Sequence, residues 1–232
     1  MKIFALLKWL YATGMIFLGM TLMIIIFPFL PKPKAQKFAS RFIQFLIFCP
    51  VNVKGTIDAD AQMFLVNHES DLDIGIIESI TAKDLAWVAK KELFEVPFYG
   101  LLLKLPNDIA VERESKTSLI KLLKDAKDRL SHGRVITIFP EGTRSHSGVM
   151  RPFKPGAKMI ADNNALRVQP IVLVNTSRYY NIKTRHYAPG TITAVILESF
   201  QADRQDKEWL NRLRDTMQKV YDDELANLTS HR

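Results

Sequence analysis

The fold is decided by residues 63–73, MFLVNHESDLD, in which four apolar residues are followed directly by a polar run. A short, unbroken apolar run is typical of a strand that is buried on both faces, as in a parallel sheet. Polar side chains that directly follow such a strand lie where α/β proteins place their functional sites. This stretch therefore predicts an α/β fold and one edge of a site.

The same alternation of apolar strand-like runs and helix-like runs continues from about residue 51 onward. Further candidate strands cover 85–89, 109–111, 135–139, 168–174 and 191–197. Two candidate helices, 115–132 and 206–227, each carry an apolar stripe at helical spacing. We expect a mostly parallel or mixed sheet that is flanked by helices and preceded by an N-terminal apolar, membrane-associated helical segment.

Composition excludes several classes of protein. With 232 residues, 47% hydrophobic and 24% charged, the chain is neither disordered nor fibrous. Its net charge is +8, but residues 1–57 carry seven basic side chains and no acid, so the remainder is nearly neutral. That distribution disfavours a nucleic-acid binder and favours an anionic membrane surface. The single cysteine, Cys49, excludes an internal disulfide, and no spacing typical of metal ligands is present.

The N-terminal segment is expected to attach the protein to a membrane. Residues 9–31 carry no charge and as a helix would extend roughly 35 Å, enough for a hydrocarbon core of about 30 Å. This run is longer than the roughly 7–15 residues of a signal peptide and lacks a small-residue cleavage site. A second apolar patch, 42–48, fits an interfacial helix and a core helix equally well. The sequence leaves open whether 9–31 crosses the bilayer or forms a re-entrant hairpin with 35–50.

These features divide the chain into an anchoring helical segment, 1–50, and a catalytic or binding domain, 51–232. Basic residues are denser after the first apolar segment than before it, which predicts that the domain lies on the cytoplasmic face of the inner membrane. If the segment serves as an anchor alone, its deletion should give a more soluble protein.

The polar run after the first strand contains a possible catalytic base. A histidine beside a carboxylate can act as a base, because the acid fixes the tautomer and stabilises the imidazolium. From spacing alone, Asp71 and Asp73 are both eligible partners of His68. Asp73, five residues on, is within reach only if His68 lies before a helix and Asp73 lies in its first turn. A helix N-cap without catalytic function would give the same polar run.

A second polar run, PEGTRS at 140–145, follows the candidate strand 135–139. Gly142 permits close approach of the backbone to a ligand, and amides after a strand can hold an anion. Arg144 adds a planar group that suits phosphate or carboxylate. Taken alone, a solvated turn would show the same pattern.

Six motifs occur in a fixed order between about residues 50 and 175. The first and fourth are Asn-His-x4-Asp at 67–73 and Phe-Pro-Glu-Gly-Thr-Arg-Ser at 139–145. The others are AKKELF with VPFYG at 89–100, IAVER at 109–113, FKPGA at 153–157 and VQPIV at 168–172. Together they resemble the PlsC-type glycerolipid acyltransferase family. One departure lies just before IAVER. In the family this motif, counted there as the second, usually begins with glycine, whereas this chain has Asn107-Asp108. Asn can also adopt left-handed backbone angles.

The resemblance implies transfer of a fatty acyl group to the sn-2 hydroxyl of 1-acylglycerol-3-phosphate (lysophosphatidic acid), giving phosphatidic acid in phospholipid biosynthesis. The donor would be an acyl carrier protein or coenzyme A thioester, and no metal or cofactor is expected. His68 is the implied base and Asp73 its orienting acid. The implied substrate-binding residues are Arg144, Arg113, Lys90, Glu141, Gly142 and Thr143, with Glu141 expected to brace the loop or an arginine.

Two alternatives remain at this point. A related acyltransferase would keep the same motifs while using glycerol-3-phosphate, another lysophospholipid or an amino-acid lipid as the acceptor. A non-catalytic membrane adaptor is the less favoured alternative, because it gives no reason for His68, Asp73 and Arg144 to occur together.

Overall fold

A mixed sheet forms the centre of the protein in a computed structural model, which describes residues 2–112, 116–145 and 147–230. Its eight strands are β1 (Val51–Lys54), β2 (Met63–Val66), β3 (Leu85–Lys90), β4 (Ile109–Val111), β5 (Val135–Ile138), β6 (Arg167–Val174), β9 (Ile192–Ile196) and β10 (Phe200–Gln201). The short strands β7 (Tyr180–Asn181) and β8 (His186–Tyr187) pair separately.

The helices are α1 (Lys2–Ile26), α2 (Lys32–Leu46), α3 (Leu72–Ile80), α4 (Lys91–Glu95), α5 (Tyr99–Lys104), α6 (Lys116–Ser131), α7 (Pro155–Asn163) and α8 (Trp209–Ser230). The strand order is β1-β9-β6-β2-β5-β3-β4, and β10 pairs with β6. Strands β6, β2, β5, β3 and β4 are parallel, whereas β9 and β10 run antiparallel to β6. The predicted α/β class and mixed sheet are confirmed.

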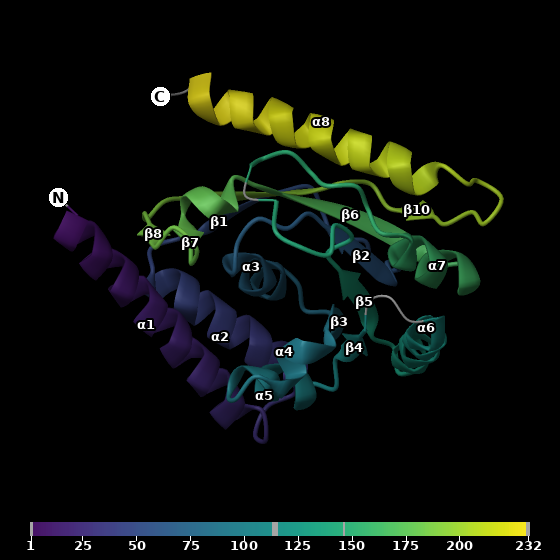
Figure 1. Ribbon diagram of the computed structural model, residues 1–232, viewed down its shortest axis with the longest axis horizontal. Coiled ribbons are helices and arrows are strands. Elements are labelled where there is room, and N and C mark those ends of the chain that lie inside the picture. Colours follow the sequence, from purple (N-terminus) through teal and green to yellow (C-terminus); the bar gives the residue numbers. More distant parts are fainter. Residues whose placement is uncertain (1, 113–115, 146, 231–232) are drawn as a thin grey trace.

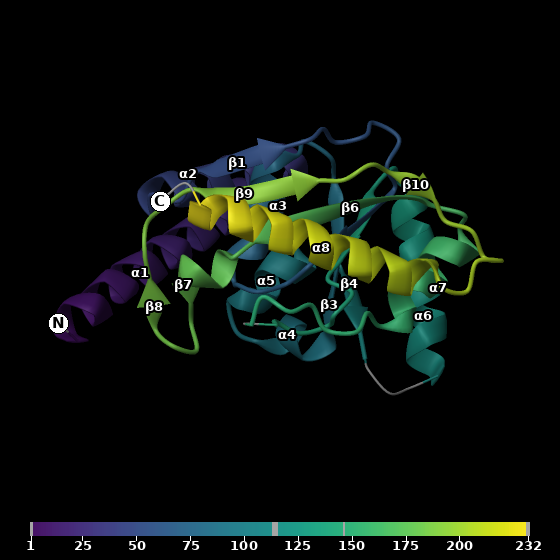
Figure 2. The ribbon, with the colours of Figure 1, turned by 90° about the horizontal axis from the view of Figure 1, so that it is seen from above.

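Side chains alternate between the two faces of β2, and this alternation separates two hydrophobic cores. Met63 and Leu65 lie in the core that α6, α7 and α8 cover, whereas Phe64 and Val66 lie in the core that α1 and α3 cover. All four side chains are fully buried. Figure 1 shows α8 across one face of the sheet and α1, α2 and α3 on the other, and Figure 2 shows α8 running along β6.

Helices α1 and α2 form a hairpin that packs along the domain (Figure 1). They approach so closely at Gly19 that an added Cβ would lie 2.0 Å from Ile43 Cγ1. The Thr13 hydroxyl lies 3.0 Å from the Tyr180 hydroxyl, and the ring of Phe17 stacks on that of Phe98 with centroids 4.5 Å apart. Helix α1 is long and apolar enough to cross a membrane by length and composition. Among the described apolar side chains of α1, only those of Ala12 and Met23 are buried, whereas Ile3, Phe4 and Leu7 in its first turns are exposed. Whether α1 crosses a bilayer or lies in it with α2 stays open.

Helix α2 buries its small and polar face and exposes aromatic rings. Its buried residues are Ala35, Gln36, Ala39 and Ser40. Phe38 and Phe45 are exposed, which reverses the pattern of a helix that packs its apolar face on a protein core. Helix α2 is therefore part of the folded domain on one side, while its other side has the character of an interfacial helix.

The segment 1–50 also contributes to the core, which changes the expectation for its removal. Ala12, Ile47 and Cys49 are fully buried in the core beneath α1 and α3. Gln36 and Ser40 donate hydrogen bonds to the buried carboxylate of Glu78 at 2.9 and 3.1 Å. Deleting 1–50 would expose this core and leave Glu78 without two partners, so we now expect an unfolded or aggregating product.

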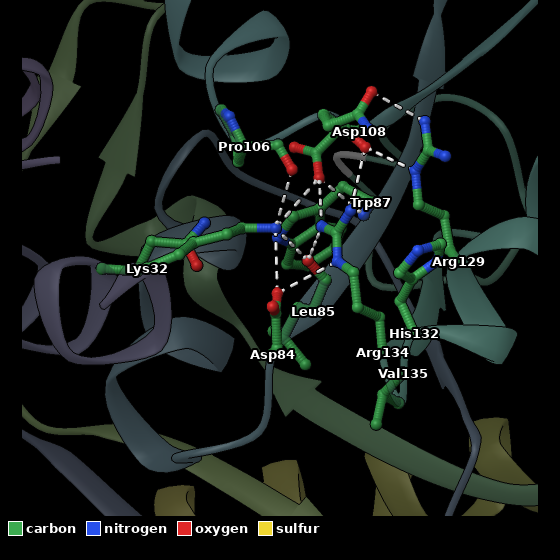
Figure 3. A network of polar contacts seen from close by, with 12 residues as sticks. Lys32, Asp84, Leu85, Trp87, Pro106, Asp108, Arg129, His132, Arg134 and Val135 are labelled. Carbon is green, nitrogen blue, oxygen red and sulfur yellow. Dashed lines mark hydrogen bonds and ion pairs between the residues drawn. The ribbon is translucent and has the colours of Figure 1, made fainter. Parts of the chain in front are cut away.

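A buried ion cluster fastens the start of α2 to the sheet (Figure 3). Lys32 Nζ lies 3.0 Å from Asp84 Oδ1 and 3.7 Å from Asp108 Oδ1, and it donates to the Leu85 carbonyl at 2.7 Å. Arg134 bridges the same two acids, with its Nε 3.0 Å from Asp84 and its Nη2 3.2 Å from Asp108. Burial raises the pKa of Asp108 to about 6 and lowers the pKa of Lys32. Asp108 is almost fully buried, whereas Asp84 is partly exposed, so Asp108 is the acid that depends most on the two cations.

Replacing Arg134 by methionine should lower the free energy of unfolding by about 3 kcal/mol, because it removes one of the two cations that compensate buried Asp108. Denaturant unfolding of the full chain in detergent micelles measures this loss. The control is Lys121→Met, which removes an exposed ion pair with Asp125 and should change stability by less than about 1 kcal/mol. Equal losses in the two variants would contradict a structural role for the cluster.

Candidate active site

The imidazole of His68 and the carboxylate of Asp73 lie side by side at the carboxyl end of β2. Nδ1 of His68 is 2.8 Å from Oδ2 of Asp73, because His68 precedes α3 and Asp73 lies in its first turn. The other partners of Asp73 are donors: the amides of Glu69 and Ser70 at 2.7 and 2.9 Å, and the Thr176 hydroxyl at 2.6 Å. Asp73 therefore acts as an acceptor, so Nδ1 of His68 carries the proton and Nε2 can serve as a base.

Two aromatic rings fix the plane of the imidazole from the neighbouring strands. The ring of His68 stacks on Phe139, which follows β5, with centroids 3.9 Å apart and planes within 9°. Phe139 in turn stacks on Trp87 of β3 at 5.1 Å. With one nitrogen held by Asp73 and one face held by Phe139, the position of Nε2 is set by the folded protein.

Glu141 holds the two polar loops together. Its side chain is buried, and its two oxygens accept the amides of His68 and Arg151 at 2.9 and 2.8 Å. The amide of Ser145 also donates to the His68 carbonyl at 2.8 Å. Burial raises the pKa of Glu141, and the two amides oppose that rise. Glu141 thus braces the loops, as expected from the sequence, and its assignment to substrate binding stays a prediction.

Arg144 and Asp71 form an ion pair that faces the same cavity as His68. Asp71 therefore orients the guanidinium of Arg144, whereas Asp73 orients His68. The spacing in the sequence left both acids eligible as the partner of His68, and the geometry assigns that role to Asp73. Both side chains of the ion pair are partly exposed. Within the described part of the chain, Nε of Arg144 is buried and has no hydrogen-bond partner. Because Arg144 lines the cavity and its side chain is partly exposed, its guanidinium can donate to an anion there.

The remaining predicted binding residues lie around this pair. Gly142 has a left-handed φ of +68°. Its amide donates a hydrogen bond to the Phe139 carbonyl at 3.0 Å, which closes a tight turn. Thr143 is exposed. Lys90 lines the cavity, and its Nζ lies 2.9 Å from Oε1 of Glu92.

The second family motif retains its turn. Asn107, which stands where the family usually has glycine, adopts a left-handed φ of +57°. The following residue, Asp108, reaches the buried ion cluster of Figure 3. Arg113, the last residue of this motif, lies outside the described residues, so its assignment to substrate binding stays a prediction.

A cavity of about 230 Å³ extends from His68 to the N-terminal helices. Helix α1 contributes Ile16, Met20 and Met23 to its wall. Helix α2 adds Ile43, and Ile47 directly follows this helix. The site thus joins a base and a cation to an apolar chamber, and both the sheet and the hairpin are needed to form it.

Helix α8 supports the site from the opposite face of the sheet. The Tyr221 hydroxyl lies 2.8 Å from Oε1 of Glu69, the residue directly after His68. Gln218 binds the backbone of the 148–150 loop through the Gly148 carbonyl and the Met150 amide. Sequence reasoning missed both contacts. The available signal was the position of Glu69 in the polar run, but nothing in the sequence pairs it with Tyr221.

A base with an orienting acid, an arginine and an apolar chamber together suit the transfer of an acyl group to an amphiphilic alcohol with an anionic head. The family described as Acyltransferase matches residues 51–174. A 1-acyl-sn-glycerol-3-phosphate acyltransferase of Helicobacter pylori is 40% identical over 168 residues, which are 72% of this chain and 71% of that protein. The chain therefore belongs to the acyltransferase family.

Two further relatives extend the similarity. A 1-acyl-sn-glycerol-3-phosphate acyltransferase of Cocos nucifera is 28% identical over 187 residues, 80% of this chain and 61% of that protein. The crystal structure of the 1-acyl-sn-glycerophosphate acyltransferase PlsC from Thermotoga maritima superposes with a TM-score of 0.73 at 24% identity, over 98% of this chain and 97% of that one. The structural match shows that the fold, including the N-terminal segment, is shared.

Glu69 should make stability depend on pH. Burial raises its pKa from an ordinary 4.5 to about 7, while hydrogen bonds such as that of Tyr221 oppose the rise. Because the folded-state pKa is the higher one, ionisation of Glu69 destabilises the fold, and its contribution falls as pH rises from about 4.5 to about 7. As pH rises from about 5 to 8, the melting temperature of wild type should therefore fall relative to that of Glu69→Gln, because only wild type ionises this buried group. If the melting temperatures of the two proteins change with pH in the same way, this role of Glu69 is contradicted. The control is Glu208→Gln at an exposed position, which should follow wild type at every pH.

Proposed function

We propose that the protein transfers a fatty acyl group from a thioester to the sn-2 hydroxyl of 1-acylglycerol-3-phosphate, giving phosphatidic acid. The observation that carries the proposal is that His68, which is held by the buried Asp73, and Arg144 face one apolar cavity. The curated names of the Helicobacter pylori and Cocos nucifera relatives support the same acceptor.

The chemistry requires a base and no covalent enzyme intermediate. Nε2 of His68 takes the proton of the acceptor hydroxyl, and the hydroxyl oxygen attacks the carbonyl carbon of the thioester. Asp73 stabilises the imidazolium that forms. When the tetrahedral intermediate collapses, the carbon–sulfur bond breaks and the imidazolium returns the proton to the departing thiolate. The proposal needs no metal or resident cofactor, since the acyl thioester of carrier protein or coenzyme A is a co-substrate.

The acceptor carries a phosphate, and Arg144 is the side chain that fits it. Its planar guanidinium can donate two parallel hydrogen bonds to phosphate oxygens, and Asp71 holds it in place. Lys90 lines the same cavity and adds a second positive charge. The apolar wall from α1 and α2 suits the hydrocarbon chain of a lipid substrate.

The lipid acceptor implies that the enzyme works at a membrane. The exposed rings of α2 and the apolar helix α1 support attachment through the hairpin. The excess of basic residues in 1–57 supports the cytoplasmic face of the inner membrane. In this arrangement the acceptor reaches His68 without complete transfer into water.

Product analysis tests the proposed function. The purified full chain is incubated with lysophosphatidate and either acyl-carrier-protein or coenzyme A thioester, and the lipid product is identified by mass spectrometry. Glycerol-3-phosphate, other lysophospholipids and amino-acid lipids form the acceptor panel. Phosphatidic acid as the main product supports the proposal, whereas preference for another acceptor overturns the acceptor while retaining acyl transfer.

Replacing His68 by alanine should lower kcat by at least about 10²–10⁴, because the base is lost. Asp73→Asn should also inactivate, but it removes acceptors from the loop and should lower the melting temperature as well. Asp71→Asn is the matched control, since that acid contacts Arg144 and should leave kcat within a fewfold range. Near-normal kcat in folded His68→Ala, or an inactive Asp71→Asn beside an active Asp73→Asn, would refute these roles.

Arg144→Ala should raise the KM for the phosphorylated acceptor by about 10–100-fold while changing the donor KM little, because one charge-assisted, bidentate contact is lost. Lysine at this position should restore only part of the affinity, since it lacks the planar fork. Acceptor and donor KM values are measured separately at saturating concentrations of the other substrate. An increase that is confined to the donor would place Arg144 at the thioester.

A further inference from the structure

Exposed apolar side chains outside the hairpin concentrate in one short segment. Among the described residues beyond position 50, eight large apolar side chains are exposed, and four of them lie between residues 93 and 105. These are Leu93 at 38%, Val96 at 44%, Leu101 at 44% and Leu105 at 53%. We call the segment 91–105, which comprises α4 and α5, the α4–α5 wedge. Such a cluster indicates an interaction surface, whereas single exposed apolar residues do not.

The α4–α5 wedge adjoins the hairpin at two places. Phe98, between α4 and α5, stacks on Phe17 of α1. Near the α1–α2 turn, Lys32 Nζ donates to the Pro106 carbonyl at 3.1 Å, directly after the wedge (Figure 3). Phe29 and Leu30 in that turn are exposed. The exposed residues of the wedge therefore continue the apolar surface of the hairpin.

The backbone of the α4–α5 wedge is held in an unusual conformation. Phe98 has a φ of +66°, which is rare for a bulky aromatic residue. A residue persists in such a conformation only where its surroundings impose it, and here the ring is stacked on Phe17. The contact with α1 thus positions the wedge.

The inner side of the α4–α5 wedge belongs to the cavity. Tyr99, Leu102 and Leu103 line it, together with Ile16 and Met20 of α1. Leu93 both lines the cavity and is exposed, so it lies where the two sides of the wedge meet. The wedge and α1 therefore contribute two walls of the same chamber, and both carry exposed apolar side chains on the outside. A lipid that lies in a bilayer against this surface would meet the cavity between them.

We propose that the α4–α5 wedge is a second membrane-contact surface, which enters the bilayer interface beside the hairpin. Its occupant is the lipid bilayer, because the surface is continuous with the apolar outer face of α1 and α2. Together with α1 it flanks the route by which the lipid acceptor enters the cavity. The contact surface stands on the exposed residues, whereas the route rests on the proposed function.

Site-specific labelling tests the contact. The full chain carrying Val96→Cys or Leu101→Cys is labelled with an environment-sensitive fluorophore and reconstituted into liposomes of phosphatidylcholine and phosphatidylglycerol. The native Cys49 is buried and burial raises its pKa to about 11, so it should not react. The control label is at Ile120→Cys on α6, a position that is 70% exposed and distant in sequence from both surfaces.

Labels at 96 and 101 should be quenched by lipids with nitroxide on the acyl chain and protected from aqueous iodide. The label at 120 should show the reverse. Quenching of all three labels by iodide to the same extent would overturn the proposal. If the label at 120 remains in water, quenching of the labels at 96 and 101 cannot result from the fluorophore entering the bilayer by itself.

A kinetic comparison tests the access route. The double variant Val96→Asp/Leu101→Asp should acylate long-chain acceptor in liposomes about tenfold more slowly, because an aspartate is unfavourable in the bilayer interface. Its rate on a short-chain acceptor dissolved in water should match that of wild type. Ile120→Asp should change neither rate. Equal losses on both acceptors would overturn the route in favour of a structural defect.

The two proposals fail in different ways. If wild type acylates neither acceptor, the proposed function is wrong, while the quenching experiment still decides whether the α4–α5 wedge contacts lipid. If wild type is active on both acceptors but the labels at 96 and 101 stay in water, the contact surface is wrong and the proposed function stands.

Discussion

The site depends on the burial of one carboxylate. Asp73 is fully inaccessible to solvent, and a charged group in that position is tolerated only when donors surround it. The donors come from the loop after β2 and from Thr176 after β6, and one of them is the imidazole itself. The requirement to satisfy this carboxylate therefore arranges the loop, the first turn of α3 and the base together. The orientation of His68 follows from folding, so no substrate is needed to produce it.

Support for this arrangement comes from both faces of the sheet, beyond the part of the chain that the family match covers. On one face Tyr221 of α8 holds Glu69, and on the other the hairpin closes the cavity. Both elements lie outside residues 51–174. The motifs within the family match thus carry the reacting groups, while the terminal helices determine how rigidly those groups are held and what they can reach.

Sequence patterns predicted the parts of this protein that local physical chemistry determines. The bounds of β2 and β4 agree with prediction, and β3, β5, β6 and β9 differ by a residue or so, because unbroken apolar runs have few alternatives in a covered sheet. Helices α4 and α5 were missed because five or six residues are too few to show a helical period. The choice between Asp71 and Asp73 needed the geometry at the start of α3. Thr176 was within reach of prediction, since it follows a third buried strand at the same sheet edge, whereas Tyr221 pairs with a residue 152 positions away.

The ion cluster around Lys32 limits how this enzyme can be re-engineered. A foreign apolar hairpin of the same length would supply lipid affinity, but without a cation at the start of α2 it would leave Asp84 and Asp108 facing Arg134 alone. A buried acid that loses a counter-charge destabilises its surroundings, here β3 and β5 at the centre of the sheet. Chimaeras should therefore exchange the hairpin together with positions 84, 108 and 134 as one unit. The membrane segment is in this sense a component of the globular fold, and its sequence is constrained by the interior of the protein as well as by lipid.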